Sequence, residues 1–182
     1  MAIQEVRVTA RTAEGDVLGQ SVLSDAQRTL GVTELDNVAT ARVYRFEGVT
    51  KKQAHRIGRV LLANPITQEY TVNTPIIQAD EVVEVGHKTG VMNPEVETVE
   101  KVTRILGITP KAVDSSTEYG FNFKENQANP GVVGKIVTEQ LVNKTVSRVI
   151  DKPPETLVTG GEVKPTEIIS LCKTRPDRLV SL

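Results

Sequence analysis

The side chains with the clearest chemical potential lie in the loop Gly86-His87-Lys88-Thr89-Gly90, which follows a β-rich segment and precedes a helical one. Two glycines, a lysine and a helix N-terminus can together hold a phosphate group. The loop matches known phosphate-binding patterns poorly, however. The corresponding earlier loop, Arg11-Thr12-Ala13-Glu14-Gly15, carries an acidic residue in that place. We therefore favour an ordinary connection between a strand and a helix.

Metal and nucleophile chemistry find little support in the sequence. The two histidines and Cys172 are far apart and show none of the short spacings of metal ligands. His55 lies on a helical segment, where an exposed histidine is the ordinary case. A Walker loop, a G-x-G-x-x-G fingerprint and a nucleophile elbow are all missing. We therefore expect no catalytic, cofactor-binding or metal-binding residue in this chain.

The aromatic residues are few and regularly placed. Most of them lie on two long β-rich segments at a spacing of two, so each set shares one face of a strand. The simplest interpretation is that they fill the core, and the alternative is that they line a seam between two units or a partner surface. All six are candidate interface residues: Tyr44, Phe46, Tyr70, Tyr119, Phe121 and Phe123. Residues 42–46 loosely resemble an RNA-recognition strand but lack its glycine.

The elements that position these residues occur twice. The first half is predicted to form strand 5–9, helix 16–31, long strand 37–46, helix 50–64 and strand 66–72. The second half is predicted to form strand 81–85, helix 93–107, long strand 114–123, a helix from about Pro130 and strand 146–150. The helix stop at Asn64-Pro65 within residues 61–70 has a weaker counterpart in residues 140–149.

This repetition predicts an α+β fold. We expect two tandem units of the order strand-helix-long strand-helix-strand, with antiparallel sheets and helices on one face, packed as a pseudo-dimer. The predicted boundaries are 1–78 for the first unit, 79–152 for the second, and 153–182 for a linker or tail that led into more protein. Residues 151–182 are expected to be loosely held, apart from docking by residues 168–171.

Bulk properties exclude several classes of function. The chain has 182 residues, a formal net charge of −1 and 25% charged residues. The charge is evenly spread along the sequence, which argues against nucleic acid or an anionic membrane as the main partner. The N-terminus lacks the regions of a signal peptide, and Cys172 has no second cysteine to pair with. We expect a cytoplasmic protein.

Two motifs resemble a known family. The segment Asn93-Pro94-Glu95-Val96-Glu97-Thr98-Val99, running to Leu106-Gly107, resembles the D-P-x-G-x-x-V … L-x-x-L-G helix of the PurS subunit of phosphoribosylformylglycinamidine synthase. Residues 61–70, Leu-Leu-Ala-Asn-Pro-Ile-Thr-Gln-Glu-Tyr, are similar to the L-L-A-N-x-x-x-E-x-Y ending of that subunit. Asp16-Val17-Leu18-Gly19 is a version of the first motif without the proline. The likeness covers about residues 3–73 and 81–150.

The resemblance implies a non-catalytic role in de novo purine biosynthesis. The family's subunit dimerises and bridges the ATP-dependent synthetase and the glutaminase, and long synthases have an N-terminal domain that resembles such a dimer fused in one chain. The expected partners are therefore the synthetase and glutaminase subunits or domains, with an internal pseudo-dimer and scope for a homo-oligomer. The chain itself would bind no cofactor, although the complex uses ATP, Mg²⁺ and glutamine. Lys144 and Val149 replace Pro65 and Tyr70 in the second unit.

One alternative stays open. Paired α+β units often create a cleft between them, so the chain could be a tandem regulatory domain that binds a small metabolite. The loop at residues 86–90 would then be the place for the ligand. A stand-alone enzyme has no support in the residues.

Overall fold

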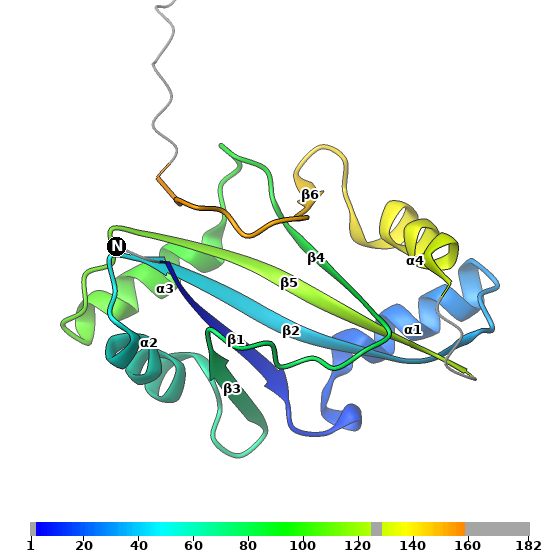
Figure 1. The fold of residues 1–182 in the computed structure, drawn as a ribbon, viewed down its shortest axis with the longest axis horizontal. Helices are drawn as coiled ribbons and strands as arrows, with labels where there is room; N and C mark the ends of the chain where they lie inside the picture. The colour runs from blue at the N-terminus through cyan, green and yellow to red at the C-terminus, as the bar shows by residue number, and fades with distance from the viewer. Residues whose placement is uncertain (1–2, 125–128, 159–182) are drawn as a thin grey trace, which may run out of the picture.

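The computed structural model describes residues 3–124 and 129–158, which have an α+β fold (Figure 1). In these residues a single six-stranded antiparallel sheet carries four α-helices. The first unit contains β1 (Gln4–Ala10), α1 (Val17–Thr29), β2 (Leu35–Glu47), α2 (Lys51–Ile57) and β3 (Gln68–Val72). The second unit contains β4 (Glu81–His87), α3 (Pro94–Ile105), β5 (Ala112–Phe123), α4 (Pro130–Ile136) and β6 (Ser147–Val149).

The predicted order of elements is confirmed, with ends that differ by a few residues. A short 3-10 turn, η1 (Ala13–Gly15), precedes α1, and the π-helical turns η2 (Gly58–Leu62) and η4 (Val137–Leu141) extend α2 and α4. Ile66 was expected on a strand but lies in a turn with 82% of its surface exposed. The reason is local, because Asn64 Oδ1 accepts a hydrogen bond from the Ile66 amide at 2.9 Å and bends the chain before β3.

The expected sheets are joined into one sheet with an approximate internal twofold symmetry. The strand order is β3-β1-β2-β5-β4-β6, so β2 and β5 pair at the centre. Arg42 lies opposite Thr117 in this central pair. The pairs on either side are related by exchange of the units: Thr40 with Tyr119, and Ser115 with Tyr44. The approximate twofold axis therefore passes close to Arg42 and Thr117.

The edge strands follow the same symmetry. Val8 of β1 lies opposite Tyr70 of β3, and Val85 of β4 lies opposite Val149 of β6. Tyr70 and Val149 are therefore counterparts, which means that they occupy related positions in the two units. The pairing is shorter in the second unit, because β6 has three residues whereas β3 has five.

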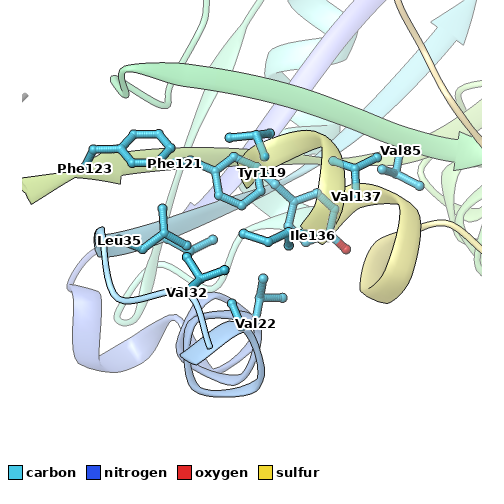
Figure 2. Close-up of a cluster of buried hydrophobic side chains, with 12 residues drawn as sticks. Val22, Val32, Leu35, Val85, Tyr119, Phe121, Phe123, Ile136 and Val137 are labelled. Atoms are coloured by element: carbon cyan, nitrogen blue, oxygen red, sulfur yellow. The ribbon is translucent and has the colours of Figure 1, made fainter. Parts of the chain in front are cut away.

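Both hydrophobic clusters contain residues of both units, so neither unit has a core of its own. The cluster in Figure 2 joins α1 of the first unit to β5 and α4 of the second. Its members include Val22, Ala26, Leu35, Tyr119, Phe121, Phe123, Val133 and Ile136. The other cluster joins β1, β2 and α2 to Val99 of α3, and it includes Val6, Val8, Tyr44, Phe46, Ala54 and Ile57.

These core residues alternate along their strands and so place all four helices on one face of the sheet. The opposite face carries a network of ion pairs that also joins the units. Arg45 is 1% exposed and forms a bidentate pair with Glu84 of β4, at 2.5 and 2.9 Å. Arg7 of β1 reaches Glu118 of β5 at 2.8 Å, and Glu5 accepts from both arginines. Each arginine thereby links its own unit to the other.

The segment between β3 and β4 crosses the polar face of the sheet (Figure 1). It passes directly over Gly120 of β5, where an added Cβ would lie 2.3 Å from the side chain of Ile77. Asp80 then accepts a hydrogen bond from the backbone amide of Phe123 at 2.9 Å. A side chain at position 120 would therefore push this linker away from the sheet.

The beginning of the tail is held more firmly than the sequence suggested. Glu47, at the end of β2, accepts hydrogen bonds from the Leu157 amide at 2.8 Å and from the Thr156 hydroxyl at 3.0 Å. Lys111 donates to the same carboxylate at 2.8 Å. A carboxylate with several donors is a strong anchor, which the sequence pattern did not reveal. The docking predicted for residues 168–171 lies outside the described residues.

Candidate functional site

The structure separates the six candidate interface aromatics into two groups. Five are buried, with exposed fractions between 0% and 9%: Tyr44, Phe46, Tyr119, Phe121 and Phe123. These five lie in the two mixed clusters, so they mainly join the units to each other. Tyr70 is only half-buried and lies on β3 at the edge of the sheet. We therefore take Tyr70 and its surroundings as the candidate site.

Tyr70 is positioned by a close contact with the helical segment that precedes it. Its ring lies over Gly58 at the start of η2, where a Cβ would be only 2.6 Å from the ring. The Tyr70 hydroxyl donates to the backbone oxygen of His55 at 3.3 Å, and the two rings meet edge to face at 6.1 Å. Only glycine at position 58 leaves room for this placement.

The turn between η2 and β3 explains the sequence motif that contains Tyr70. The Asn64 side chain accepts hydrogen bonds from the backbone amides of Ile66 and Thr67. The backbone amide of Asn64 donates to the side chain of Gln68 at 2.9 Å. Pro65 at the next position cannot continue the helix. The π-helical turn at η2 closes with the Ala63 amide donating to the Gly58 oxygen at 2.9 Å. The second unit has the corresponding turn at η4, where the Val142 amide donates to the Val137 oxygen at 2.9 Å.

A cavity of about 280 Å³ opens beside Tyr70. It is lined by Arg11, Arg59, Ala63, Pro65, Gln68, Glu69 and Tyr70. Arg11 contacts Glu69 only at 4.0 Å and the oxygen of Pro65 at 3.5 Å. The cavity thus combines an aromatic ring with two cationic side chains near solvent, which suits an acidic or polar group of a partner.

The counterpart region of the second unit is built differently. Val137 stands in place of Gly58 and Val149 in place of Tyr70, so the close contact of ring and glycine is absent. The end of the turn is retained, because Asn143 Oδ1 accepts from the Thr145 amide at 2.9 Å as Asn64 does in the first unit. The turn therefore belongs to the fold, whereas the Tyr70 contact is specific to the first unit.

The glycine loop at residues 86–90 lines a polar cavity of about 210 Å³. The Lys88 ammonium donates to the backbone oxygen of Lys144 at 2.5 Å, which ties the loop to the segment before β6. The cavity is lined by groups of both signs, including Lys88, Arg148 and Asp114. The Asn93 side chain, at the start of α3, caps the helix and donates a hydrogen bond to Ser115. A strand-to-helix connection, as predicted, accounts for these contacts.

The first residue of each family-like motif caps a helix at corresponding places. Asp16 accepts from the Gly19 amide at 2.9 Å and from the amide and hydroxyl of Thr40 at 2.5 and 2.6 Å. Its counterpart Asn93 accepts from the Glu95 amide at 3.1 Å and donates to Ser115 at 2.9 Å. Each cap thus fastens its helix to the central strand of its own unit.

Gly19 completes the first motif, because a Cβ there would lie 2.2 Å from the backbone oxygen of Val38. Close approach of α1 to β2 therefore requires glycine. At the sheet centre, Tyr44 donates to Glu95 at 2.8 Å, and Arg42 contacts the same carboxylate at 3.3 Å. Burial and the hydrogen bond to Glu95 raise the pKa of Tyr44, so its hydroxyl acts as a donor throughout the physiological range.

Searches for a metal site and a membrane span in the described residues, and for related proteins, gave no match. Within residues 3–124 and 129–158, three or more histidine, cysteine or acidic side chains nowhere gather as a metal site, and Cys172 lies outside this range. The helices in the described part are too short or too polar to span a membrane. A scan of the chain against protein-family models finds no match, and a search of curated proteins finds no significant match.

Proposed function

We propose that this chain is a non-catalytic bridging component of phosphoribosylformylglycinamidine synthase, which couples the glutaminase to the ATP-dependent synthetase. One observation carries the proposal. The residues through which the chain resembles the PurS family make defined structural contacts: Asp16 and Gly19 at the start of α1, Asn93 and Pro94 at the start of α3, and Asn64 and Tyr70 around η2. Each of these residues has a structural role, which supports the proposal.

The joined sheet adds support. The family's subunit is a dimer, and a dimer fused in one chain needs two units related by an approximate twofold axis. The central pairing of β2 with β5 and the mixed clusters have that arrangement. A rigid body with two different ends is suited to hold two partners at a fixed distance.

The physical need for such a bridge follows from the chemistry of ammonia. Ammonia released into water at neutral pH is mostly protonated and is therefore a poor nucleophile. A glutaminase held against the synthetase delivers it before it is lost, which is a gain in proximity. In this proposal the chain supplies alignment, while ATP, Mg²⁺ and glutamine bind to its partners.

Reconstitution with purified synthetase and glutaminase components tests the proposal. We expect that removing this chain abolishes most turnover with glutamine but leaves turnover with ammonia at high pH nearly unchanged. The comparison of two nitrogen donors is its own control, because a general loss of synthetase activity would reduce both rates. Equal glutamine-dependent rates with and without the chain would refute the bridging function.

A second candidate function rests on the cavity at residues 86–90. Its size and its Lys88 and Arg148 side chains would suit a small anionic metabolite. A thermal-shift screen with nucleotides and amino acids tests this alternative, since a ligand at about 100 times its dissociation constant adds roughly 2.7 kcal/mol to stability. No shift with any ligand would remove it.

A further inference from the structure

The helical segment beside Tyr70 has an exposed basic face. Residues 51–62, which form α2 and η2, contain no acidic residue. Its basic side chains all lie on the exposed side of the segment: Lys51, Lys52, His55, Arg56 and Arg59. Lys52, Arg56 and Arg59 are spaced by four and three residues and so follow one line along the surface. Arg11, the residue after β1, lines the cavity at Tyr70 together with Arg59. We name Lys51, Lys52, Arg56, Arg59 and Arg11 the basic stripe.

The basic stripe is hardly neutralised within the chain. In the described part of the molecule, only Arg11 has an acidic neighbour within the range of an ion pair, Glu69 at 4.0 Å. Lys51 and Lys52 also stand in the first turn of α2, where the helix dipole disfavours positive charge. Arg56 lies in the last turn of α2, where the helix dipole favours positive charge. The stripe is thus mostly unpaired among the described residues, although the net charge of the chain is −1.

Apolar side chains accompany the stripe. Val60, which follows the cavity residue Arg59, is 55% exposed, and Ile66, which follows the cavity residue Pro65, is 82% exposed. In Figure 1, α2 and β3 lie side by side at the lower left. Arginine, aromatic and aliphatic groups in one patch are typical of the centre of a protein–protein interface.

The counterpart surface of the second unit lacks this character. Lys135 corresponds to Arg56, Thr138 to Arg59, Glu139 to Val60 and Thr145 to Ile66. Lys135 and Thr138 are exposed, as their counterparts are. Two surfaces on the same scaffold thus differ in charge and in apolar content, although the helix and turn beneath them are alike.

We propose that the basic stripe and the Tyr70 cavity dock an acidic protein segment that carries at least one apolar side chain. The acidic groups would pair with Arg56, Arg59 and Arg11, and the apolar side chain would lie against Tyr70. Under the proposed function, on which this inference rests, one of the two enzyme components supplies the segment. Nucleic acid is the weaker fit, because the segment is only about 18 Å long and exposed aliphatic groups interrupt it.

Binding of the full chain to the purified synthetase and glutaminase components, measured by calorimetry at low and high ionic strength, tests this proposal. The test variant is Arg56→Glu with Arg59→Glu, and the matched control is Lys135→Glu with Thr138→Glu on the counterpart surface. All four positions are exposed. Because Lys135 donates a hydrogen bond to the backbone oxygen of Leu30 at 3.3 Å, thermal unfolding of both variants is measured beside binding, at a temperature where both are folded. A single-stranded RNA of about 20 nucleotides serves as the probe for nucleic acid, because it is longer than the binding site of a typical single-strand-binding domain.

We expect the test variant to weaken binding to one component by at least about tenfold and the control to change it by less than about twofold. Binding of the unmodified chain should also weaken at high salt. Equal effects of both variants, or tighter binding to RNA than to either component, would overturn the docking surface and leave the bridging function standing. Failure of the unmodified chain to bind either component would overturn both.

Discussion

The two units share an interior and differ at their outer ends. Both begin a helix with a side-chain cap bonded to the central strand, through Asp16 and Thr40 in one and through Asn93 and Ser115 in the other. At the sheet edges, Tyr70 over Gly58 is replaced by Val149 and Val137. What the units keep in common holds the fold together. What only the first unit has is therefore the better guide to function.

The largest expected effect comes from separating the units. Residues 1–78 alone would leave Val22, Ala26 and Leu35 without Tyr119, Phe121 and Ile136, which complete their cluster. We expect this fragment to form a homodimer through β2 or to remain unfolded, because each buried aliphatic or aromatic side chain contributes about 1.5–3 kcal/mol. Sedimentation and circular dichroism over a range of concentrations measure both outcomes. A stable, folded monomer would contradict the mixed cores.

The helix caps should differ in strength although they correspond in position. Asp16→Ala removes the cap of α1 and leaves the buried amide and hydroxyl of Thr40 without their acceptor. We expect a loss of about 3 kcal/mol in the free energy of unfolding. Asn93→Ala should cost only about 1 kcal/mol. Urea denaturation measures both, and equal losses would show that the two hydrogen bonds from Thr40 to Asp16 add no more than the single one from Asn93 to Ser115.

The contact of Tyr70 with Gly58 gives the next effect in size. Gly58→Ala should destabilise the chain by about 1–2 kcal/mol, because the new Cβ overlaps the ring of Tyr70. In a Tyr70→Val background the same change should stabilise by about 0.5–1 kcal/mol through helix propensity. A double-mutant cycle on thermal unfolding tests this coupling. The same sign of the Gly58→Ala effect in both backgrounds would contradict it.

Gln140 provides a change that should increase stability. Its side-chain nitrogen and oxygen are buried and have no hydrogen-bond partner among the described residues. The counterpart, Leu61, packs against a hydrophobic cluster. Gln140→Leu should therefore raise the free energy of unfolding by about 1 kcal/mol. Leu61→Gln, the reverse exchange in the first unit, should lower it, and destabilisation by both changes would show that the units differ here in packing.

The smallest effect concerns the anchor of the tail. The hydrogen bond from Lys111, with those from Leu157 and Thr156, lowers the pKa of Glu47 to about 2. Because the folded pKa is depressed, the anchor is fully present above the ordinary glutamate pKa of about 4.3 and is lost as the pH falls toward about 2. Hydrogen exchange at the Leu157 amide should show this loss, and Glu47→Gln should remove its dependence on pH. Unchanged protection at acidic pH would contradict the anchor.

Most of the fold could be predicted from the sequence because its signals are local. Asp16, Asn93 and Pro94 mark helix starts, Asn64-Pro65 marks a stop, and alternating aromatics mark the long strands. These signals depend on a few neighbouring residues, so they survive without knowledge of the partner elements. The mixing of residues from both units in each hydrophobic cluster could not be predicted. It depends on how β2 and β5 are aligned, which no local pattern specifies.

The candidate site was less accessible to sequence analysis. Five of the six aromatics were buried by pairing between the units, which no local pattern encodes. The basic stripe is hidden in the charge of the first half of the chain, because residues 1–80 contain nine basic and nine acidic residues. Counting charge over residues 51–62 alone, with the helical period in view, would have found it.

The linker over Gly120 has a consequence for how such a molecule can change. In a pair of identical chains, every substitution appears at both ends, so a surface cannot be altered for one partner without altering it for the other. A covalent linker keeps the second unit at millimolar effective concentration. It also lets each unit have its own sequence, so one end can be substituted without the other. The linker between Val72 at the end of β3 and Glu81 at the start of β4 thus allows two structurally similar units to have different surfaces. Under the proposed bridging function, two unlike partners require two different ends.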